Sequence, residues 1–405
     1  MHEALRQNSA QYYHEQGDHD KMGHKPWVTV MQVLPALNTG GVERGTLDVA
    51  EAIILSGGRA LVVSQGGLLQ EELEQSGAEH IKMPVASKNP FMILWNANKL
   101  KDLIRAYGVD VIHARSRAPA WSAYLAAKAC GIPFVTSHHG IYSDGLWGWK
   151  KFYNAIMWKS DKIIAVSQEI RERLLQKHHV AKDKVVLIHR GVDTVKFDPY
   201  VIEPQKIMDY FEQHNLPQDK RFVLLAGRIS RWKGMEDLIR AMQLVQTPDL
   251  MALIVGPSQA DDSYAFQLEK EIMQLKLQDR VRILPDCQDM PHLYSLASIV
   301  ISASKLPEPF GRITAEGMAM QRPVLAPQHG GAAEQIIHEQ TGWLFEPNNI
   351  QDLAAGIDYI AGLTDQHLEA LGYEARLHVC TNFSKQQMVN ATLDVYASLL
   401  ENRIS

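Results

Sequence analysis

Cysteine is scarce in this sequence, and the three that occur are Cys130, Cys287 and Cys380. They lie far apart in the chain and show no metal-ligand spacing. An odd number of scattered cysteines argues against a disulfide framework and against a zinc cluster. We therefore expect a protein of a reducing compartment and a cytoplasmic location.

Long apolar runs and an excess of positive charge are also missing. No run approaches the roughly 20 apolar residues that a membrane-spanning helix needs. Residues 1–26 are polar and lack the apolar core of a signal peptide, so we interpret them as a flexible polar arm. The net charge of -5 excludes a nucleic-acid binder that works by bulk charge.

The sequence does contain a regular alternation of short apolar runs and amphipathic stretches. Residues 27–35 form a β-branched run, and residues 42–58 follow with helical periodicity. The alternation predicts an α/β protein whose parallel sheet is covered by helices on both faces. Further strands of the first half are predicted at 59–65, 110–114, 133–137, 162–167 and 185–189.

A polar segment, residues 191–220, interrupts this rhythm and carries three prolines. The alternation restarts at 221–227, and a chain of 405 residues is long enough for two domains. We therefore predict two similar doubly wound, Rossmann-like domains that face a cleft, where ligands of such sheets bind. The predicted boundaries are 27–200 for the N-terminal domain, 201–220 for a linker, 221–383 for the C-terminal domain and 384–405 for a C-terminal helix.

Two glycine-containing loops follow the first predicted strand of each half. In NTGGVERG (38–45), Gly40 and Gly41 let the backbone approach a ligand at the start of a helix. A plain strand–helix turn is the structural alternative. In GRISRWKG (227–234), Arg228 and Lys233 supply a planar fork and a point charge, which together suit a diphosphate. Solvated loop cations are the alternative there.

The stretch EPFGRITAE (308–316) leads from a strand into a helical pattern. The first amides of that helix, near Ile313 and Thr314, have no intrahelical partners and can bind phosphate oxygens. Glu316 lies on the second turn, where its carboxylate can accept two hydroxyl hydrogens, as a ribose offers. Glu308 lies before the helix, near the space that a bound sugar would fill.

A structural explanation also exists for the second glutamate. Glu316 and Arg312 are four residues apart, so they could form an exposed ion pair worth only about 0.3–0.5 kcal/mol. Such a pair would not explain the Pro-Phe-Gly turn at 309–311, which lies between the two glutamates.

Taken together, these motifs resemble those of the retaining glycosyltransferases of family 4, which have the GT-B fold. The resemblance covers roughly residues 28–400 and keeps the family's order of motifs. The motifs are NTGGVER, DVIHARS, VTSHHG, IIAVSQ, IHRGVD, GRISRWKG, EPFGRITAE and HGGAAEQI. In that fold the C-terminal helices return toward the first domain.

The resemblance implies a role for each matching residue. Arg228 and Lys233 would hold the diphosphate of the donor, Glu316 its ribose, and Glu308 the transferred sugar. The backbone at Phe310 would face the same sugar. The predicted donor-binding residues are Gly40, Gly41, Arg228, Lys233, Pro309, Phe310, Gly311, Ile313, Thr314 and Glu316.

A histidine in TSHHG resembles the family's active-site histidine, and its position before Gly140 assigns it to His139. His138 is a close rival, and one of the two would be a core residue. The predicted catalytic residues are therefore His139 and Glu308.

Two positions depart from the family pattern. Ala303 stands where Pro is frequent, and Arg190 replaces a common Asn before Gly191. Both are set aside here, because neither coincides with an expected contact.

The implied activity is the transfer of a sugar from a nucleotide-diphosphate sugar to an acceptor hydroxyl with retention of anomeric configuration. Two cations and a helix end can stabilise the leaving diphosphate, so neither a metal nor a cofactor is expected. The expected acceptor is a glycan or glycolipid, such as lipopolysaccharide core or capsule. A sugar-nucleotide epimerase, a phosphorylase or a non-catalytic nucleotide-sugar binder on the same fold are the alternatives.

One aromatic segment leaves two interpretations open. Residues 145–162 mix tryptophans and other aromatics with lysines. That composition suits peripheral contact with the inner face of the cell membrane, where anionic lipid attracts lysine. It also suits an amphipathic helix that packs on the sheet, and the shortness of the pattern favours this second interpretation. Residues 87–101 resemble the acceptor side of the family.

Overall fold

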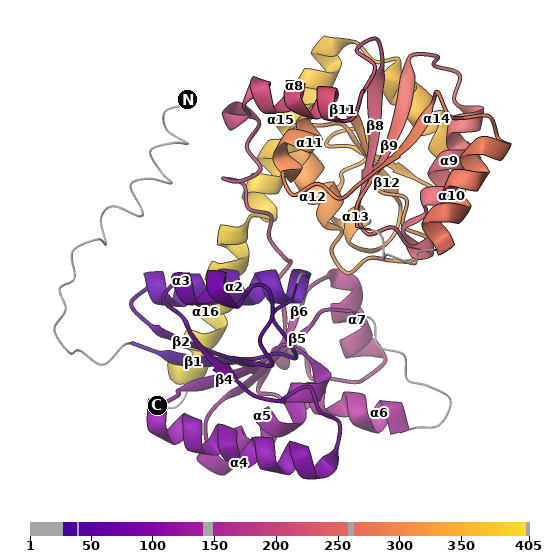
Figure 1. Ribbon diagram of the computed structural model, residues 1–405. Helices are drawn as coiled ribbons and strands as arrows, with labels where there is room; N and C mark the ends of the chain where they lie inside the picture. The colour runs from indigo at the N-terminus through magenta and orange to yellow at the C-terminus, as the bar shows by residue number, and fades with distance from the viewer. Residues whose placement is uncertain (1–26, 39, 141–148, 258–262, 402–405) are drawn as a thin grey trace.

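The computed structural model describes residues 27–38, 40–140, 149–257 and 263–401, which form two α/β domains (Figure 1). The arm at 1–26 and residues 145–148 of the aromatic segment lie outside the described residues. Among the helices of the described ranges, none is long and apolar enough to cross a bilayer.

The first domain is built on a seven-stranded parallel sheet with the order β3-β2-β1-β4-β5-β6-β7. Helices α2, α3 and α16 pack on one face, and α4 and α5 pack on the other (Figure 1). The strands are β1 (Thr29–Val33), β2 (Arg59–Ser64), β3 (Glu79–Lys82), β4 (Val111–Ala114), β5 (Phe134–His138), β6 (Lys162–Ala165) and β7 (Val185–Leu187). The helices are α2 (Gly41–Leu55), α3 (Gln70–Gln75), α4 (Pro90–Tyr107), α5 (Arg117–Cys130), α6 (Trp149–Asn154) and α7 (Gln168–Gln176).

Local sequence signals explain where these helices begin and end. The side chain of Asn89 accepts a hydrogen bond from the Phe91 amide at 2.9 Å, and Pro90 occupies the first position of α4. The same helix ends at Gly108, which has the left-handed conformation that glycine tolerates best. Every residue of β1 is buried, as expected for the central strand of a sheet covered on both faces.

The second domain has a six-stranded parallel sheet with the order β10-β9-β8-β11-β12-β13. Its strands are β8 (Arg221–Ala226), β9 (Leu250–Val255), β10 (Val281–Leu284), β11 (Ala297–Ile301), β12 (Val324–Pro327) and β13 (Trp343–Phe345). Its helices are α8 (Pro204–Gln213), α9 (Met235–Leu244), α10 (Ser263–Gln274), α11 (Met290–Leu296), α12 (Arg312–Ala319), α13 (Gly330–Gln335), α14 (Ile350–Ala361) and α15 (Asp365–Asn382). The prediction of two Rossmann-like parallel-sheet domains is confirmed.

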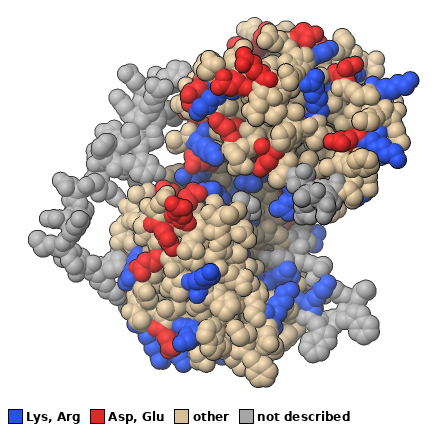
Figure 2. Space-filling view, in the orientation of Figure 1, with Lys and Arg blue, Asp and Glu red and all other residues tan. Residues whose placement is uncertain are grey.

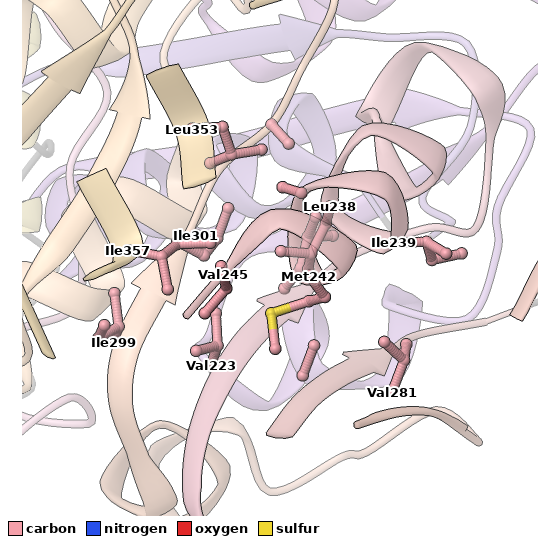
Figure 3. Packing of buried hydrophobic residues seen from close by; sticks show 14 of the residues in the cluster. Val223, Leu238, Ile239, Met242, Val245, Val281, Ile299, Ile301, Leu353 and Ile357 are labelled. Atoms are coloured by element: carbon pink, nitrogen blue, oxygen red, sulfur yellow. The ribbon is translucent and has the colours of Figure 1, made fainter. Parts of the chain in front are cut away.

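One core of this domain lies between the sheet and helices α9 and α14. Figure 3 shows Met242 of α9 near Val223 of β8, and Leu238 of α9 and Ile357 of α14 belong to the same cluster. All four side chains are fully buried, and burial of each such side chain stabilises the fold by about 1.5–3 kcal/mol. The packing of α9 on the sheet matters for the site, because the loop before α9 carries Arg228 and Lys233, two of the predicted donor-binding residues.

The last helix, α16 (Lys385–Glu401), returns to the first domain, as expected, and completes its core (Figure 1). The Tyr396 hydroxyl of α16 hydrogen-bonds Nδ1 of His113 at 2.6 Å. Nε2 of His113 bonds the Ser137 hydroxyl at 2.7 Å. Burial lowers the pKa of His113 well below its usual range, so this network holds a neutral imidazole.

The chain passes between the two domains twice, near residues 191–193 and near residues 383–385, and these two crossings are hydrogen-bonded to each other. The Val192 amide donates to the Phe383 carbonyl, and the Lys385 amide donates to the Val192 carbonyl, both at 2.8 Å. A Cβ on Gly191 would lie 2.4 Å from the Lys385 Cα, so this close approach requires glycine. Nζ of Lys385 also binds Oδ2 of Asp193 at 2.9 Å. The crossings therefore form one paired connector.

The structure adds elements that sequence patterns did not indicate. Within 201–220, predicted as a linker, α8 packs against α11, and Tyr210 and Phe211 contact the core of the second domain. The composition of this segment is polar, but Pro204 at the first helical position is a helix-start signal. Strands β3 and β13 are short strands at sheet edges, where an apolar run is not needed.

Candidate active site

Two distant motifs meet at Glu308. Nζ of Lys233 lies 2.8 Å from Oε1 of Glu308, and the Ser304 hydroxyl donates to the same oxygen. The side chains of Lys233 and Glu308 are only 12% and 14% exposed. A mostly buried pair with a further hydrogen bond has a fixed geometry, unlike a surface ion pair. The carboxylate of Glu308 is thus held in one orientation.

A tight backbone contact brings Lys233 to this position. Gly234, which precedes α9, has φ 72°, and a Cβ there would lie 1.9 Å from the Ala303 carbonyl oxygen. The Lys305 amide donates to the Trp232 carbonyl at 2.8 Å. The loop after β8 and the loop after β11 therefore pack backbone to backbone, which only glycine permits at 234.

The turn at Pro309–Gly311 is held from the other side by α13. The Gly331 amide donates to the Glu308 carbonyl at 2.8 Å, and the Gln335 side chain donates to the Phe310 carbonyl. Phe310 is buried. Gly311 has φ 81° and directly precedes α12, so the chain turns sharply into the helix.

The beginning of α12 offers donors for an anion. Its first amides, including that of Ile313, have no carbonyl partner four residues back within the helix. The Thr314 hydroxyl is buried, and it has no hydrogen-bond partner among the described residues. A Cβ on Gly311 would lie 3.6 Å from that hydroxyl, so the space in front of the helix is lined by Gly311 and Thr314. These groups suit the oxygens of a phosphate.

Glu316 is bound to a tyrosine rather than to Arg312. The Tyr294 hydroxyl donates to Oε2 of Glu316 at 2.8 Å. Burial raises the pKa of Glu316, and the nearby Arg312 charge and the Tyr294 hydrogen bond act in the opposite direction. Among the ion pairs of the described residues there is none between Glu316 and the exposed Arg312. The surface-pair explanation of Glu316 is therefore wrong.

A cavity of about 540 Å³ opens between the domains at this point. Its floor includes Phe310, Arg312 and Glu316 of the second domain, and its other walls include Arg44 and Asp48 of α2. Figure 2 shows blue basic and red acidic surfaces facing each other along the line where the domains meet. Burial raises the pKa of Asp48 to about 6, against the charges of Lys385 and Arg44.

His139 lies on the first-domain side, directly after β5. Both of its ring nitrogens are buried and have no hydrogen-bond partner among the described residues. Burial, followed by the charge of Arg190, lowers the pKa of His139 well below its usual range. Its rival His138 is the last residue of β5, where burial lowers its pKa to about 3. Of the two histidines, only His139 follows the end of β5, whereas His138 belongs to the strand itself.

The remaining predicted residues lie at the carboxyl ends of strands. Gly40 precedes α2 and Gly41 is its first residue, while Arg228 is exposed after β8. A Cβ on Gly41 would lie 2.1 Å from a terminal nitrogen of Arg190. Arg190, which departs from the family pattern, therefore packs against one predicted donor residue.

Three participants were missed by sequence reasoning. Ser304 and Tyr294 bind the two glutamates, but a serine in a loop and a tyrosine in an apolar stretch carry no distinctive signal. Arg190 did carry one, since it departs from the family pattern. Over the described ranges, no group of three or more His, Cys, Asp or Glu residues is placed to hold a metal ion.

The sequence matches two family models that together span most of the chain. The model described as Glycosyltransferase Family 4 matches residues 39–196, and the model described as Glycosyl transferases group 1 matches residues 206–378. An uncharacterized glycosyltransferase of Methanocaldococcus jannaschii is 26% identical over 91% of this chain and 96% of its own. A D-inositol 3-phosphate glycosyltransferase of Catenulispora acidiphila is 28% identical over 74% of this chain and 75% of its own.

Solved structures agree with the family models. A glycosyltransferase from Rickettsia africae is 39% identical, covers 93% of this chain and 99% of its own, and superposes with a TM-score of 0.87. HepE of Anabaena, solved in complex with UDP and glucose, covers 92% of this chain and all of its own, with 22% identity and a TM-score of 0.79. The chain therefore belongs to the family 4 glycosyltransferases and has the GT-B fold.

Proposed function

We propose that this protein is a retaining, metal-independent glycosyltransferase that uses a nucleotide-diphosphate sugar. The observation that carries the proposal is the bonded unit of Lys233, Ser304 and Glu308 beside the beginning of α12. Glu316, about one helical turn further along α12, lines the interdomain cavity. These groups can serve the sugar, the phosphates and the ribose of one extended ligand.

The donor is proposed to bind with its diphosphate in front of α12. Arg228 and Lys233 supply positive charge there, and the first amides of α12 and the Thr314 hydroxyl supply hydrogen-bond donors. Oε2 of Glu316 is occupied by Tyr294, so the remaining lone pairs of this carboxylate are proposed to accept from the ribose hydroxyls. The complex of HepE with UDP-glucose makes a UDP sugar the first donor to test.

The reaction is proposed to proceed on one face of the anomeric carbon. The bond between that carbon and the β-phosphate oxygen breaks, and its electron pair stays with the leaving diphosphate. The acceptor oxygen bonds to the same face, and its proton passes to a β-phosphate oxygen. Arg228, Lys233 and the α12 amides stabilise the developing charge, which is the principal catalytic contribution of such a site.

His139 and Glu308 are proposed to position the transferred sugar. Because the pKa of His139 lies well below neutrality, its ring is uncharged and presents one donor and one acceptor nitrogen to sugar hydroxyls. Glu308, held by Lys233 and Ser304, accepts from hydroxyls on the opposite side. Neither residue then needs to act as a charged base.

The acceptor is proposed to be a glycan or glycolipid that the first domain binds, such as lipopolysaccharide core or capsule. Structural neighbours include proteins of lipopolysaccharide biosynthesis, and a capsular polysaccharide glycosyltransferase is among the sequence relatives. On α4, Phe91 is 82% exposed and Trp95 is 46% exposed, close to the expected acceptor side. We propose a cytoplasmic protein, and these exposed aromatic side chains support its peripheral contact with the inner face of the cell membrane.

The aromatic segment gives this membrane contact only partial support. Trp158 stacks on His178 with ring centroids 4.0 Å apart, and Tyr153 packs beside Trp121. Phe152 also packs beside Trp121, with ring centroids 5.5 Å apart, but it is 64% exposed. Packing therefore involves Phe152, Tyr153 and Trp158 alike, and of these only Phe152 remains largely exposed.

The proposed function is tested by Lys233→Ala and Glu308→Ala. Both substitutions break the bonded unit, and we expect donor turnover to fall at least about 100-fold in each, as for a lost transition-state contact. Lys270→Ala, which removes an exposed lysine of α10, is the matched control. Near-normal rates in both site variants would refute the assignment, and turnover without an acceptor would favour an epimerase.

A further inference from the structure

Arg190 lies where the first domain meets the cleft. A Cβ on Gly41 would lie 2.1 Å from one terminal nitrogen of the Arg190 guanidinium group and 3.8 Å from the other. Gly41 is the first residue of α2, a helix of 15 residues, so the positive end of that helix dipole points to the same place. A guanidinium group and a helix beginning together concentrate positive potential there.

The surroundings of Arg190 include the predicted active-site histidine. Of the charges that act on His139, that of Arg190 has the largest influence. His139 has two buried ring nitrogens without partners among the described residues, which indicates that its polar contacts belong to a ligand. Arg190 therefore packs against Gly41, and its charge acts on His139.

The residues on either side fix the backbone of Arg190. Nε2 of His189 bonds Oε2 of Glu334, in the second domain, at 2.8 Å. Gly191 packs directly on the backbone of Lys385. Arg190 therefore belongs to the first domain but is anchored on both sides to the second domain and to the paired connector. Its position relative to the donor site depends on the cleft being assembled.

We propose that Arg190 binds the β-phosphate of the donor from the first-domain side. The diphosphate is then held between Arg228 and Lys233 on one side and Arg190 on the other. A planar guanidinium group can donate two parallel hydrogen bonds to one phosphate. A nucleoside monophosphate has only the α-phosphate, which lies further from Arg190 and does not receive these hydrogen bonds. The inference rests on the proposed function, and it adds a first-domain cation that selects nucleoside diphosphates over monophosphates.

The test is calorimetric binding of UDP, GDP and ADP, and then of the monophosphate that matches the tightest ligand. The variants are Arg190→Asn, which restores the residue frequent in the family, and Arg190→Lys, which keeps the charge but loses the fork. Arg105→Asn, at an exposed position of α4, is the matched control. We expect Arg190→Asn to weaken diphosphate binding about tenfold or more, the effect of one charge-assisted contact.

Monophosphate binding should stay within about twofold in Arg190→Asn, and Arg190→Lys should recover part of the diphosphate affinity. Equal losses for both nucleotides, or unchanged diphosphate binding, would overturn the inference. If Arg190→Asn does not fold, the ratio of the two affinities in Arg190→Lys decides, because a lower diphosphate preference is still expected there. Absence of any nucleotide binding by the unmodified protein would instead refute the proposed function.

A second readout tests whether the guanidinium group of Arg190 faces His139. Removal of the Arg190 charge should raise the pKa of His139, because a positive neighbour disfavours its protonated form. The imidazole signals of His139, followed by NMR against pH, should therefore titrate at higher pH in Arg190→Asn than in the unmodified protein. An unchanged titration would show that the guanidinium does not face His139.

Discussion

At the scale of single residues, the two glutamates of EPFGRITAE owe their orientation to different partners. Glu308 is held by a lysine and a serine, and Glu316 by a tyrosine. Each partner contacts one carboxylate oxygen, so both carboxylates keep lone pairs for a ligand. The difference gives each glutamate its own sensitivity to mutation.

Tyr294→Phe tests the second of these contacts. The Tyr294 hydroxyl stabilises the ionised form of Glu316, so its loss should raise the already elevated pKa of that carboxyl further. Ribose binding needs the ionised form as acceptor. We therefore expect the acid limb of nucleotide binding to move to higher pH, and the affinity at neutral pH to fall by up to about tenfold.

The measurement is the dissociation constant of the nucleotide as a function of pH. Tyr373→Phe, at an exposed position of α15, serves as the control. An acid limb at the same pH in Tyr294→Phe and in the unmodified protein would show that Glu316 does not control ribose binding.

At the scale of elements, glycines decide how closely the loops of the site approach one another. Gly234 combines a positive φ with a contact to the Ala303 carbonyl, whereas Gly131 has φ 67° and no atom within 4 Å of a Cβ. Alanine substitutions at the two positions therefore separate two contributions to the free energy of unfolding. Both substitutions strain the backbone conformation, but only the one at Gly234 also creates a steric overlap.

We expect Gly131→Ala to cost about 1 kcal/mol in the free energy of unfolding, from its backbone conformation alone. Gly234→Ala should cost at least about 2 kcal/mol more, because the methyl group overlaps a carbonyl oxygen. It should also lower donor turnover by displacing Lys233. Denaturant unfolding of both variants measures the difference, and equal costs would mean that the loops are free to separate.

Helix α7 of the first domain is capped by Glu334 of the second. Oε2 of Glu334 accepts from the Gln168 amide at 2.8 Å, and Oε1 accepts from the Glu169 amide at 3.3 Å. The same carboxylate bonds His189. A negative charge at a helix beginning is favourable, so this contact draws the domains together.

Glu334→Gln should weaken that contact and lower the melting temperature by a few degrees. Although burial alone would raise the pKa of Glu334, hydrogen bonds from His189, Gln168 and Glu169 outweigh it and lower the pKa. A lowered folded-state pKa contributes stability that is complete above the unfolded pKa near 4.5 and is lost as pH falls through the folded pKa.

The difference in melting temperature between Glu334→Gln and the unmodified protein should therefore shrink below about pH 4.5. Glu271→Gln, which breaks a surface pair with Arg240, should change stability by less than about 1 kcal/mol at any pH. A difference for Glu334→Gln that is independent of pH would contradict the role of its charge.

At the scale of the whole molecule, the sequence predicts the two sheets better than the paths between them. The strands at 27–35 and 221–227 are recognisable because buried parallel strands are continuous apolar runs. The short edge strands β3 and β13 and helix α8 are not, since their stability comes from neighbours rather than from their own pattern.

The same limit applies to the site. The family resemblance names Lys233 and Glu308 separately, but their contact joins residues 75 positions apart and depends on how two loops pack. The position of Arg190 depends likewise on both chain crossings, so only the assembled structure reveals what it faces. Sequence patterns identify the groups that meet a ligand, while their supporting contacts come from the fold.

The most direct test of this account is a crystal structure of the protein with the nucleoside diphosphate that it binds most tightly. We expect the ribose at Glu316 and the diphosphate in front of α12, between Lys233 and Arg190. A nucleotide bound elsewhere, or one whose phosphates contact neither α12 nor Lys233, would contradict the proposed donor site.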